Sequence, residues 1–150
     1  MKDTQAVDPK ELGPLISRAS VCRIGMCLDD VPYVVPMNFG YRDSCVYLHS
    51  SKSGRKLDII RANDNVCFEV DIDAELVDSG SPCACGMRYK SVIAFGKASL
   101  VENRAGKTEA LDAITEHYLG GASGEYDEAV LDAVVIIKVE LESATVKSNT

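Results

Sequence analysis

Residues 47–56 combine groups that could bind an anion. The β-favouring residues 46–48 lead into serines and a glycine, and after Gly54 the apolar positions take the spacing of one helix face. This order predicts a strand, a turn, and a short helix over residues 54–62. Free backbone N–H groups and the positive end of the dipole make such a helix start an anion site.

The side chains at this turn favour phosphate as the anion. Arg55 offers a planar fork of donors and Lys56 a point charge. Hydroxyls are added by Ser50, Ser51 and Ser53. The alternative is an N-capped surface helix with two solvated cations, and these residues alone do not decide between the two.

Length and composition predict one globular domain over residues 1–150, with flexible ends at 1–8 and 143–150. The formal net charge of −7 argues against nucleic acid as a partner. No apolar run approaches the roughly 20 residues of a membrane helix, and residues 1–9 lack the apolar core of a signal peptide. We therefore expect a cytoplasmic protein that binds neither nucleic acid nor membrane.

Six cysteines fall into two groups. Four lie in apolar, strand-like runs and are expected to be buried, reduced thiols: Cys22, Cys27, Cys45 and Cys67. Cys83 and Cys85 form a C-x-C in a polar connection, a weak zinc signal because no second pair with zinc spacing accompanies it. We expect no metal and no structural disulfide, and this exposed pair is the one most prone to oxidation.

The alternation of apolar residues predicts six strands, at residues 21–28, 32–41, 45–49, 66–72, 88–101 and 134–141. Further helices are expected from Asp8-Pro9 onward and over residues 105–119, with a helical turn at 128–132. Gly96 inside the fifth strand predicts a bulge. Six strands joined mostly by hairpins, with helices inserted, indicate a mainly β antiparallel barrel.

Four segments occur in this order along the chain: V-P-M-N-F-G-Y, Y-L-H-S-S-K-S-G-R-K, C-F-E-V-D and M-R-Y-K-S-V-I-A-F-G-K-A. This order resembles the FMN-binding split barrel of the pyridoxamine 5′-phosphate oxidase-like superfamily, and within it the 5-nitroimidazole-resistance (Nim-type) flavoproteins. The resemblance covers about residues 12–147. It implies a six-stranded antiparallel split β-barrel with inserted helices, and a homodimer with FMN at its interface.

The resemblance also implies how FMN would be held. Its phosphate would bind Arg55 and Lys56, with Ser50 and Gly54 at the turn. The family motif places the imidazole of His49 near the flavin.

The remaining contacts implied by the resemblance involve the flavin ring. The main chain around Pro36, Met37 and Asn38 would line the isoalloxazine edge. From the long fifth strand, Lys90 and Ser91 would approach the ring or the ribityl chain.

Three function classes follow from this resemblance. The first is a flavin oxidoreductase that reduces nitroaromatic (nitroimidazole) or quinone-like small molecules, with His49 as a candidate catalytic proton donor. The second is a haem-binding split barrel with His49 as ligand, and the third a non-catalytic FMN-binding or redox-sensing protein.

Two features of the chain restrict the reaction. Its last residues do not supply the Arg and His that pyridoxamine phosphate oxidases use near their C-terminus, so vitamin B6 oxidation is not expected. The chain also has no nicotinamide fingerprint, so electrons would come from transiently bound NAD(P)H or from another reductase.

Overall fold

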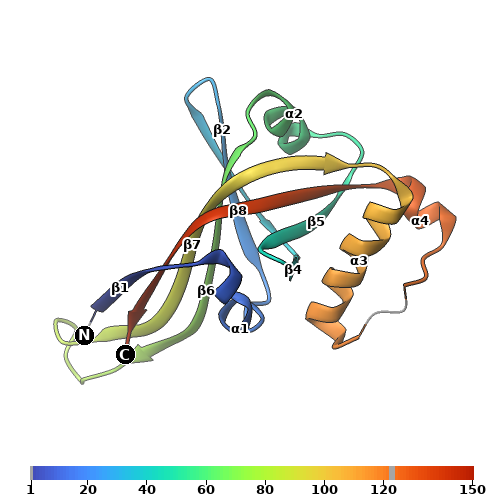
Figure 1. Cartoon of the computed structure of the whole chain (residues 1–150). Helices are drawn as coiled ribbons and strands as arrows, with labels where there is room; N and C mark the ends of the chain where they lie inside the picture. Colours follow the sequence, from blue (N-terminus) through green and yellow to red (C-terminus); the bar gives the residue numbers. More distant parts are fainter. Residues whose placement is uncertain (1, 122–123) are drawn as a thin grey trace.

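The computed structural model describes residues 2–121 and 124–150 as one antiparallel sheet with helices packed against it (Figure 1). The strands are β1 (Lys2–Val7), β2 (Cys22–Leu28), β3 (Val31–Met37), β4 (Gly40–Arg42), β5 (Cys45–Ser51), β6 (Asn65–Val77), β7 (Gly86–Val101) and β8 (Val134–Asn149). The helices are the 3₁₀ turn η1 (Pro9–Glu11), α1 (Gly13–Ile16), α2 (Arg55–Ala62), α3 (Arg104–Leu119) and α4 (Glu128–Ala133). None of the helices in these ranges is long and apolar enough to cross a membrane.

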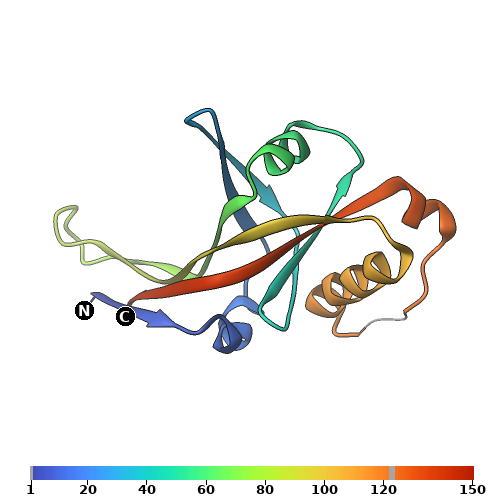
Figure 2. The same ribbon diagram turned by 45° about the horizontal axis from the view of Figure 1, so that its top comes forward.

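The sheet has the strand order β3-β2-β6-β7-β8-β5-β4, with every neighbouring pair antiparallel. The long strands β6, β7 and β8 run across the molecule, and the sheet curls while β3 and β4 remain unclosed edges (Figures 1 and 2). The predicted class, a mainly β antiparallel split barrel with inserted helices, is confirmed.

The number of strands differs from the six that the sequence predicts, because the stretch over residues 32–41 divides into β3 and β4. The chain leaves the first ladder at Asn38 and brings Gly40 against helix α3. A Cβ atom at Gly40 would overlap the backbone of Ala113 and Ile114. Only glycine permits this approach, and it depends on a helix far along the chain.

The other additional pairing joins the two ends, which the sequence predicts to be flexible. In the structure β1 pairs with the last part of β8, in a register that runs from Lys2 opposite Asn149 to Val7 opposite Ala144. Residue 1 lies outside the described residues. Polar side chains conceal this ladder in the sequence, because backbone N–H and C=O groups pair whatever side chains they carry.

The first helical region is shorter than predicted. Asp8 does cap it, with its carboxylate accepting a hydrogen bond from the N–H of Lys10 at 2.9 Å. The region then divides into η1 and α1, and Pro14 lies in the first turn of α1, where its missing N–H leaves no helical hydrogen bond unmade. Leu12 and Ile16 are fully buried and fix both pieces against the sheet.

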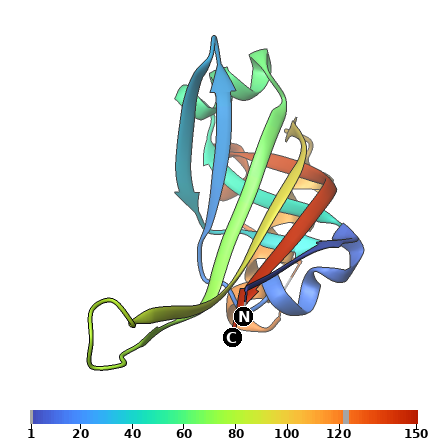
Figure 3. The same ribbon diagram turned by 90° about the vertical axis from the view of Figure 1, so that its left-hand side faces the viewer.

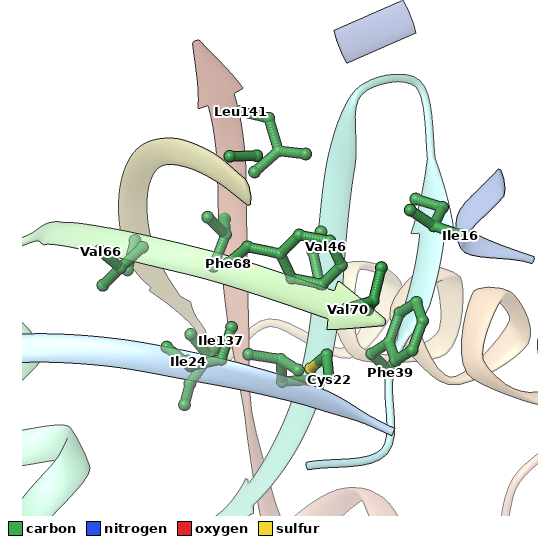
Figure 4. Close-up of a cluster of buried hydrophobic side chains, with 14 of the residues drawn as sticks. Ile16, Cys22, Ile24, Phe39, Val46, Val66, Phe68, Val70, Ile137 and Leu141 are labelled. Carbon is green, nitrogen blue, oxygen red and sulfur yellow. The ribbon is translucent and has the colours of Figure 1, made fainter. Parts of the chain in front are cut away.

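Two apolar clusters hold the fold together. The larger fills the inside of the curled sheet, where Phe39 and Phe68 meet edge to face with ring centroids 5.6 Å apart (Figure 4). The smaller lies between α3 and the outer face of β5 and β8, around Tyr47, Ile114 and Ile136. Strand β5 is therefore covered on both faces, which fixes the position of the segment that follows it.

The irregularity expected at Gly96 is present, and its extra residue, Glu142, lies on the neighbouring strand β8. The register of β7 on β8 shifts between Phe95 and Gly96, and a Cβ atom at Gly96 would overlap the backbone carbonyl of Glu140. The shift adds the local twist that a bulge produces. The sheet can curl at this position because residue 96 has no side chain.

Replacing Gly96 by alanine should therefore lower the free energy of unfolding by about 1–3 kcal/mol, the usual cost of overpacking. Gly86→Ala is the matched control in the same strand, since a Cβ there meets nothing within 4 Å. Its effect should stay within about 0.5 kcal/mol. Denaturant unfolding of both variants measures the difference, and equal stabilities would contradict the packing role of Gly96.

Candidate functional site

The turn between β5 and α2 has the strand–turn–helix form that the sequence predicts. Gly54 is the N-cap of α2, at φ 143°, and no side chain caps the helix. The first N–H groups of a helix have no acceptor within the helix, and they carry the positive end of its dipole. A Cβ at Gly54 would meet nothing within 4 Å, so the space beside this N-cap residue is open.

Arg55 differs from the other arginines of this acidic chain. The six others each form an ion pair with a carboxylate: Arg18, Arg23, Arg42, Arg61, Arg88 and Arg104. Within residues 2–121 and 124–150, Arg55 has no carboxylate partner. Its guanidinium lies over the ring of Tyr33 from β3, 4.5 Å from the ring centroid. This cation–π contact positions the guanidinium and leaves its N–H donors free of acidic partners.

The three serines of the turn have different roles. Ser50 is buried, and its hydroxyl donates to the carbonyl of Ser51 at 3.0 Å. The hydroxyl of Ser51 in turn donates to the carbonyl of Ser53, also at 3.0 Å. These two bonds brace the turn, so Ser53 and the half-buried Lys56 are the neighbours of Arg55 best placed to receive an anion.

His49 lies at the end of β5, six residues before Arg55 in the chain. Alternation along the strand places Val46, Leu48 and Ser50 on the inner face and His49 on the outer face with Tyr47. Helix α3 covers Tyr47 but leaves His49 exposed. Its imidazole is therefore accessible to a ligand near the turn.

The second histidine has a structural role. The Nε2 atom of His117 lies 2.6 Å from the carbonyl oxygen of Ala19, and its ring stacks on Phe39 with centroids 4.4 Å apart. These contacts attach α3 to the segment before β2.

Pro36, Met37 and Asn38 lie at the open edge of the sheet. β3 pairs with β2, with Pro36 opposite Arg23 and Met37 opposite Cys22, and its other side has no neighbouring strand in the described chain. Pro36 and Asn38 are exposed. The main-chain groups of this edge can therefore hydrogen-bond a flat polar ring.

Lys90 and Ser91 are half-buried near the start of β7, paired with Ile72 and Asp71 of β6. This part of β7 lies near the chain termini, at the end of the sheet away from α2 (Figures 1 and 3). One chain thus brings Tyr33 to Arg55 of the turn, and His49 precedes that turn on β5, but the chain does not bring Lys90 and Ser91 to it.

An apolar outer face of the sheet was not assigned from the sequence. In register across four strands lie Val34, Gly25, Cys67 and Phe95. Val34 is 61% exposed and Phe95 57%, and they border a hollow of about 330 Å³. The alternation in residues 88–101 does separate Ile93 and Phe95 from Val92 and Ala94, but alternation alone does not say which face is the core.

A charged group borders this face. Arg23 contacts the carboxylates of Asp71 at 2.6 Å and Glu69 at 3.7 Å. Burial, followed by the charge of Asp71, raises the pKa of Glu69, while Arg23 opposes the shift. The apolar row therefore has a polar border, as an interface does.

Comparison with known proteins places this chain in a family. Residues 8–148 match the sequence model of the pyridoxamine 5′-phosphate oxidase family, and the chain belongs to that family. It also matches the uncharacterised protein RA0666 of Rhizobium meliloti (strain 1021), with 27% identity over 88 residues, or 59% of this chain. The match covers 51% of that protein, so this chain spans about half the length of its curated relative.

Two solved structures show the same fold. A candidate 5-nitroimidazole antibiotic resistance protein from Bacteroides thetaiotaomicron is 30% identical with a TM-score of 0.80, covering 100% of this chain and 93% of its own. The FAD and heme binding protein from Mycobacterium smegmatis is 19% identical with a TM-score of 0.81, covering 97% of this chain and 73% of its own.

Proposed function

We propose that this protein is an FMN-binding oxidoreductase that reduces nitroaromatic or quinone-like small molecules, and that it works in the cytoplasm. The observation that carries the proposal is the uncapped start of α2, with Arg55 held on Tyr33 and free of carboxylate partners. A dianionic phosphate would supply the charge that this turn lacks.

The rest of FMN would lie along residues close to this turn. The open edge of β3 offers main-chain groups at Pro36, Met37 and Asn38 for the polar rim of the isoalloxazine ring. His49 is exposed beside the turn and could give a proton to a substrate. Bound flavin supplies the electron transfer itself, which none of these side chains can perform.

The substrate class is proposed from similarity. The Bacteroides thetaiotaomicron protein, linked to 5-nitroimidazole resistance, is similar to this chain over its whole length. NAD(P)H that binds transiently, or a separate reductase, would reduce the flavin. The pyridoxamine 5′-phosphate oxidase name of the family does not carry that substrate to this chain, because a family name alone identifies no substrate-binding residue.

Haem is the second candidate ligand, since a protein of the same fold from Mycobacterium smegmatis binds both FAD and heme. His49 would then be an axial ligand. The absorption spectrum of the purified protein distinguishes the two, because flavin and haem absorb differently. A non-catalytic flavoprotein would give the flavin spectrum without anaerobic turnover of NAD(P)H and a nitroimidazole.

We further propose that two copies form a homodimer around the flavin. Lys90 and Ser91 lie away from the turn within one chain, so they could reach the same FMN only from a second chain. The exposed apolar row at Val34 and Phe95 is the surface a second copy would cover. A two-fold axis would make this interface isologous.

The phosphate assignment predicts a specific loss of affinity. Arg55→Ala and Lys56→Ala should each weaken FMN by about 1.5–3 kcal/mol, because each removes a charge-assisted contact. This corresponds to roughly 10- to 150-fold in Kd. Titration of the apoproteins with FMN and with riboflavin, which lacks the phosphate, measures the effect.

Only FMN should respond to these two changes. Arg61→Ala is the matched control, since Arg61 lies in the last turn of the same helix and pairs with Asp58. The affinity for FMN could be unchanged in a folded variant that carries both Arg55→Ala and Lys56→Ala, or the affinity for riboflavin could fall equally. Either result would show that the turn does not hold the phosphate.

The role of His49 predicts a loss of turnover without loss of cofactor. His49→Ala should retain FMN, because the anchor lies at Arg55 and Lys56, while kcat for a nitro or quinone acceptor falls by about 10²-fold. His117→Asn is the control imidazole, outside the site. If only KM changes in His49→Ala, His49 contacts the substrate but is not the proton donor. If the variant loses FMN, His49 supports the flavin pocket instead.

The proposed interface predicts that Phe95→Glu converts the dimer to a monomer, because it places a charge in the apolar row. Leu119→Glu is the matched control, since Leu119 is 81% exposed at the end of α3. Sedimentation at micromolar concentration measures both. A wild-type protein that is monomeric with FMN bound would refute the dimer and leave the phosphate site intact.

A further inference from the structure

Two of the six cysteines differ from the others in their surroundings. The strands of the sheet hold four partly or fully buried ones: Cys22, Cys27, Cys45 and Cys67. Burial raises the pKa of Cys22 to about 12 and also raises the pKa of Cys45 and of Cys67. Since the thiolate is the reactive form, the raised pKa values make the thiols of Cys22, Cys45 and Cys67 unreactive. Cys83 and Cys85 are exposed.

The two exposed thiols share a loop at the tip of the β6–β7 hairpin, an arm that projects beyond the curled sheet (Figure 3). The carboxylate of Asp78 accepts a hydrogen bond from the N–H of Gly80 at 2.8 Å. The carbonyl of Ser81 accepts from the N–H groups of Ala84 and Cys85 at 2.9 and 3.1 Å. These bonds form a turn that includes Cys83 and ends at Cys85.

General chain geometry allows a disulfide between two cysteines separated by one residue in a turn. Cα atoms two residues apart in a turn lie about 5–6 Å from each other, within the usual disulfide range of about 4.4–6.8 Å. Exposed disulfides have more oxidising potentials than buried structural ones and are the labile class. A bridge between Cys83 and Cys85 would therefore form and break readily.

The two thiols are not equivalent. The thiol of Cys85 donates to Oδ1 of Asp78 at 3.5 Å, whereas Cys83 has no hydrogen-bond partner among the described residues. The Gly80 N–H, and then Cys85, lower the pKa of Asp78, so this carboxylate is ionised at neutral pH. The hydrogen bond to Asp78 occupies the thiol of Cys85, whereas the thiol of Cys83 has no such contact, so we take Cys83 as the thiol that attacks first.

We propose that Cys83 and Cys85 are a thiol–disulfide exchange pair whose oxidant is a low-molecular-weight disulfide, RSSR. The Cys83 thiolate attacks one sulfur of RSSR, forming a Cys83–SR mixed disulfide and releasing RS⁻. Cys85 loses its proton to solvent and attacks the Cys83 sulfur, which forms the Cys83–Cys85 bridge and releases the second RS⁻. The two cysteines are oxidised, and RSSR is reduced to two thiols. Within one chain, this hairpin tip lies away from the β5–α2 turn.

The test oxidises the fully reduced full-length protein with glutathione disulfide, blocks free thiols by alkylation, and measures peptide masses. The wild type should show a bridge within residues 83–85 that a dithiol reverses. Cys85→Ser should instead accumulate the glutathione adduct at Cys83, since the second step is lost. Asp78→Asn should form the bridge several-fold faster than the wild type, because a neutral amide oxygen holds the Cys85 thiol less strongly than a carboxylate does. Cys67→Ser is the matched control and should behave as the wild type.

Three results would overturn the proposal. In the first, Cys83 and Cys85 are still alkylated after treatment with the oxidant. In the second, the wild type keeps stable glutathione adducts on both cysteines. In the third, the disulfide joins two chains. Each outcome is independent of whether FMN binds, so this test and the flavin titration can fail separately.

Discussion

The continuous ladder of β6, β7 and β8 is the constraint on which the rest of this structure depends. β7 pairs with β6 on one side and with β8 on the other along most of its length. A ladder this long encloses a core only if it bends, and the irregularity at Gly96 provides the bend. The curled sheet then closes over Phe39 and Phe68, and β5 becomes buried on both faces. The position of the β5–α2 turn follows from that burial.

Electrostatics distinguishes this turn from the rest of the surface. The chain carries 23 carboxylates against 16 lysines and arginines, so a cation usually finds an acidic neighbour. Arg55 instead lies on the Tyr33 ring, at a helix start with no side-chain cap. A cation held away from carboxylates retains its full attraction for an added anion, whereas a paired one must first lose its partner. Within residues 2–121 and 124–150, Arg55 thus has no carboxylate partner, while the acidic residue in the first turn of α2, Asp58, pairs with Arg61.

The strands, turns and helices that depend on neighbouring residues could be predicted from the sequence. The features that depend on contacts between distant segments could not. Local alternation located the strands, and the serine–glycine–cation order located the turn and α2. The division between β3 and β4 depends on Gly40 meeting α3, and the Tyr33–Arg55 contact joins segments with no shared pattern. The β1–β8 ladder was hidden because its side chains are polar. For β7, alternation gave two faces, but only the folded sheet shows that Phe95 faces outward.

The sheet also separates three kinds of chemistry on one small chain. The β5–α2 turn follows β5, and the apolar row lies on the outer face of β2, β3, β6 and β7. The exposed thiols lie on the β6–β7 arm, beyond both. The register irregularity between Ile72 and Glu75 marks where β6 leaves the curled sheet and becomes that arm. Because the core ladder does not pass through the tip, a bond between Cys83 and Cys85 can form without disturbing the packing around Phe68. The same separation explains why Lys90 and Ser91, at the base of the arm, cannot serve the turn of their own chain. A second copy therefore has to supply them if they contact the flavin at all.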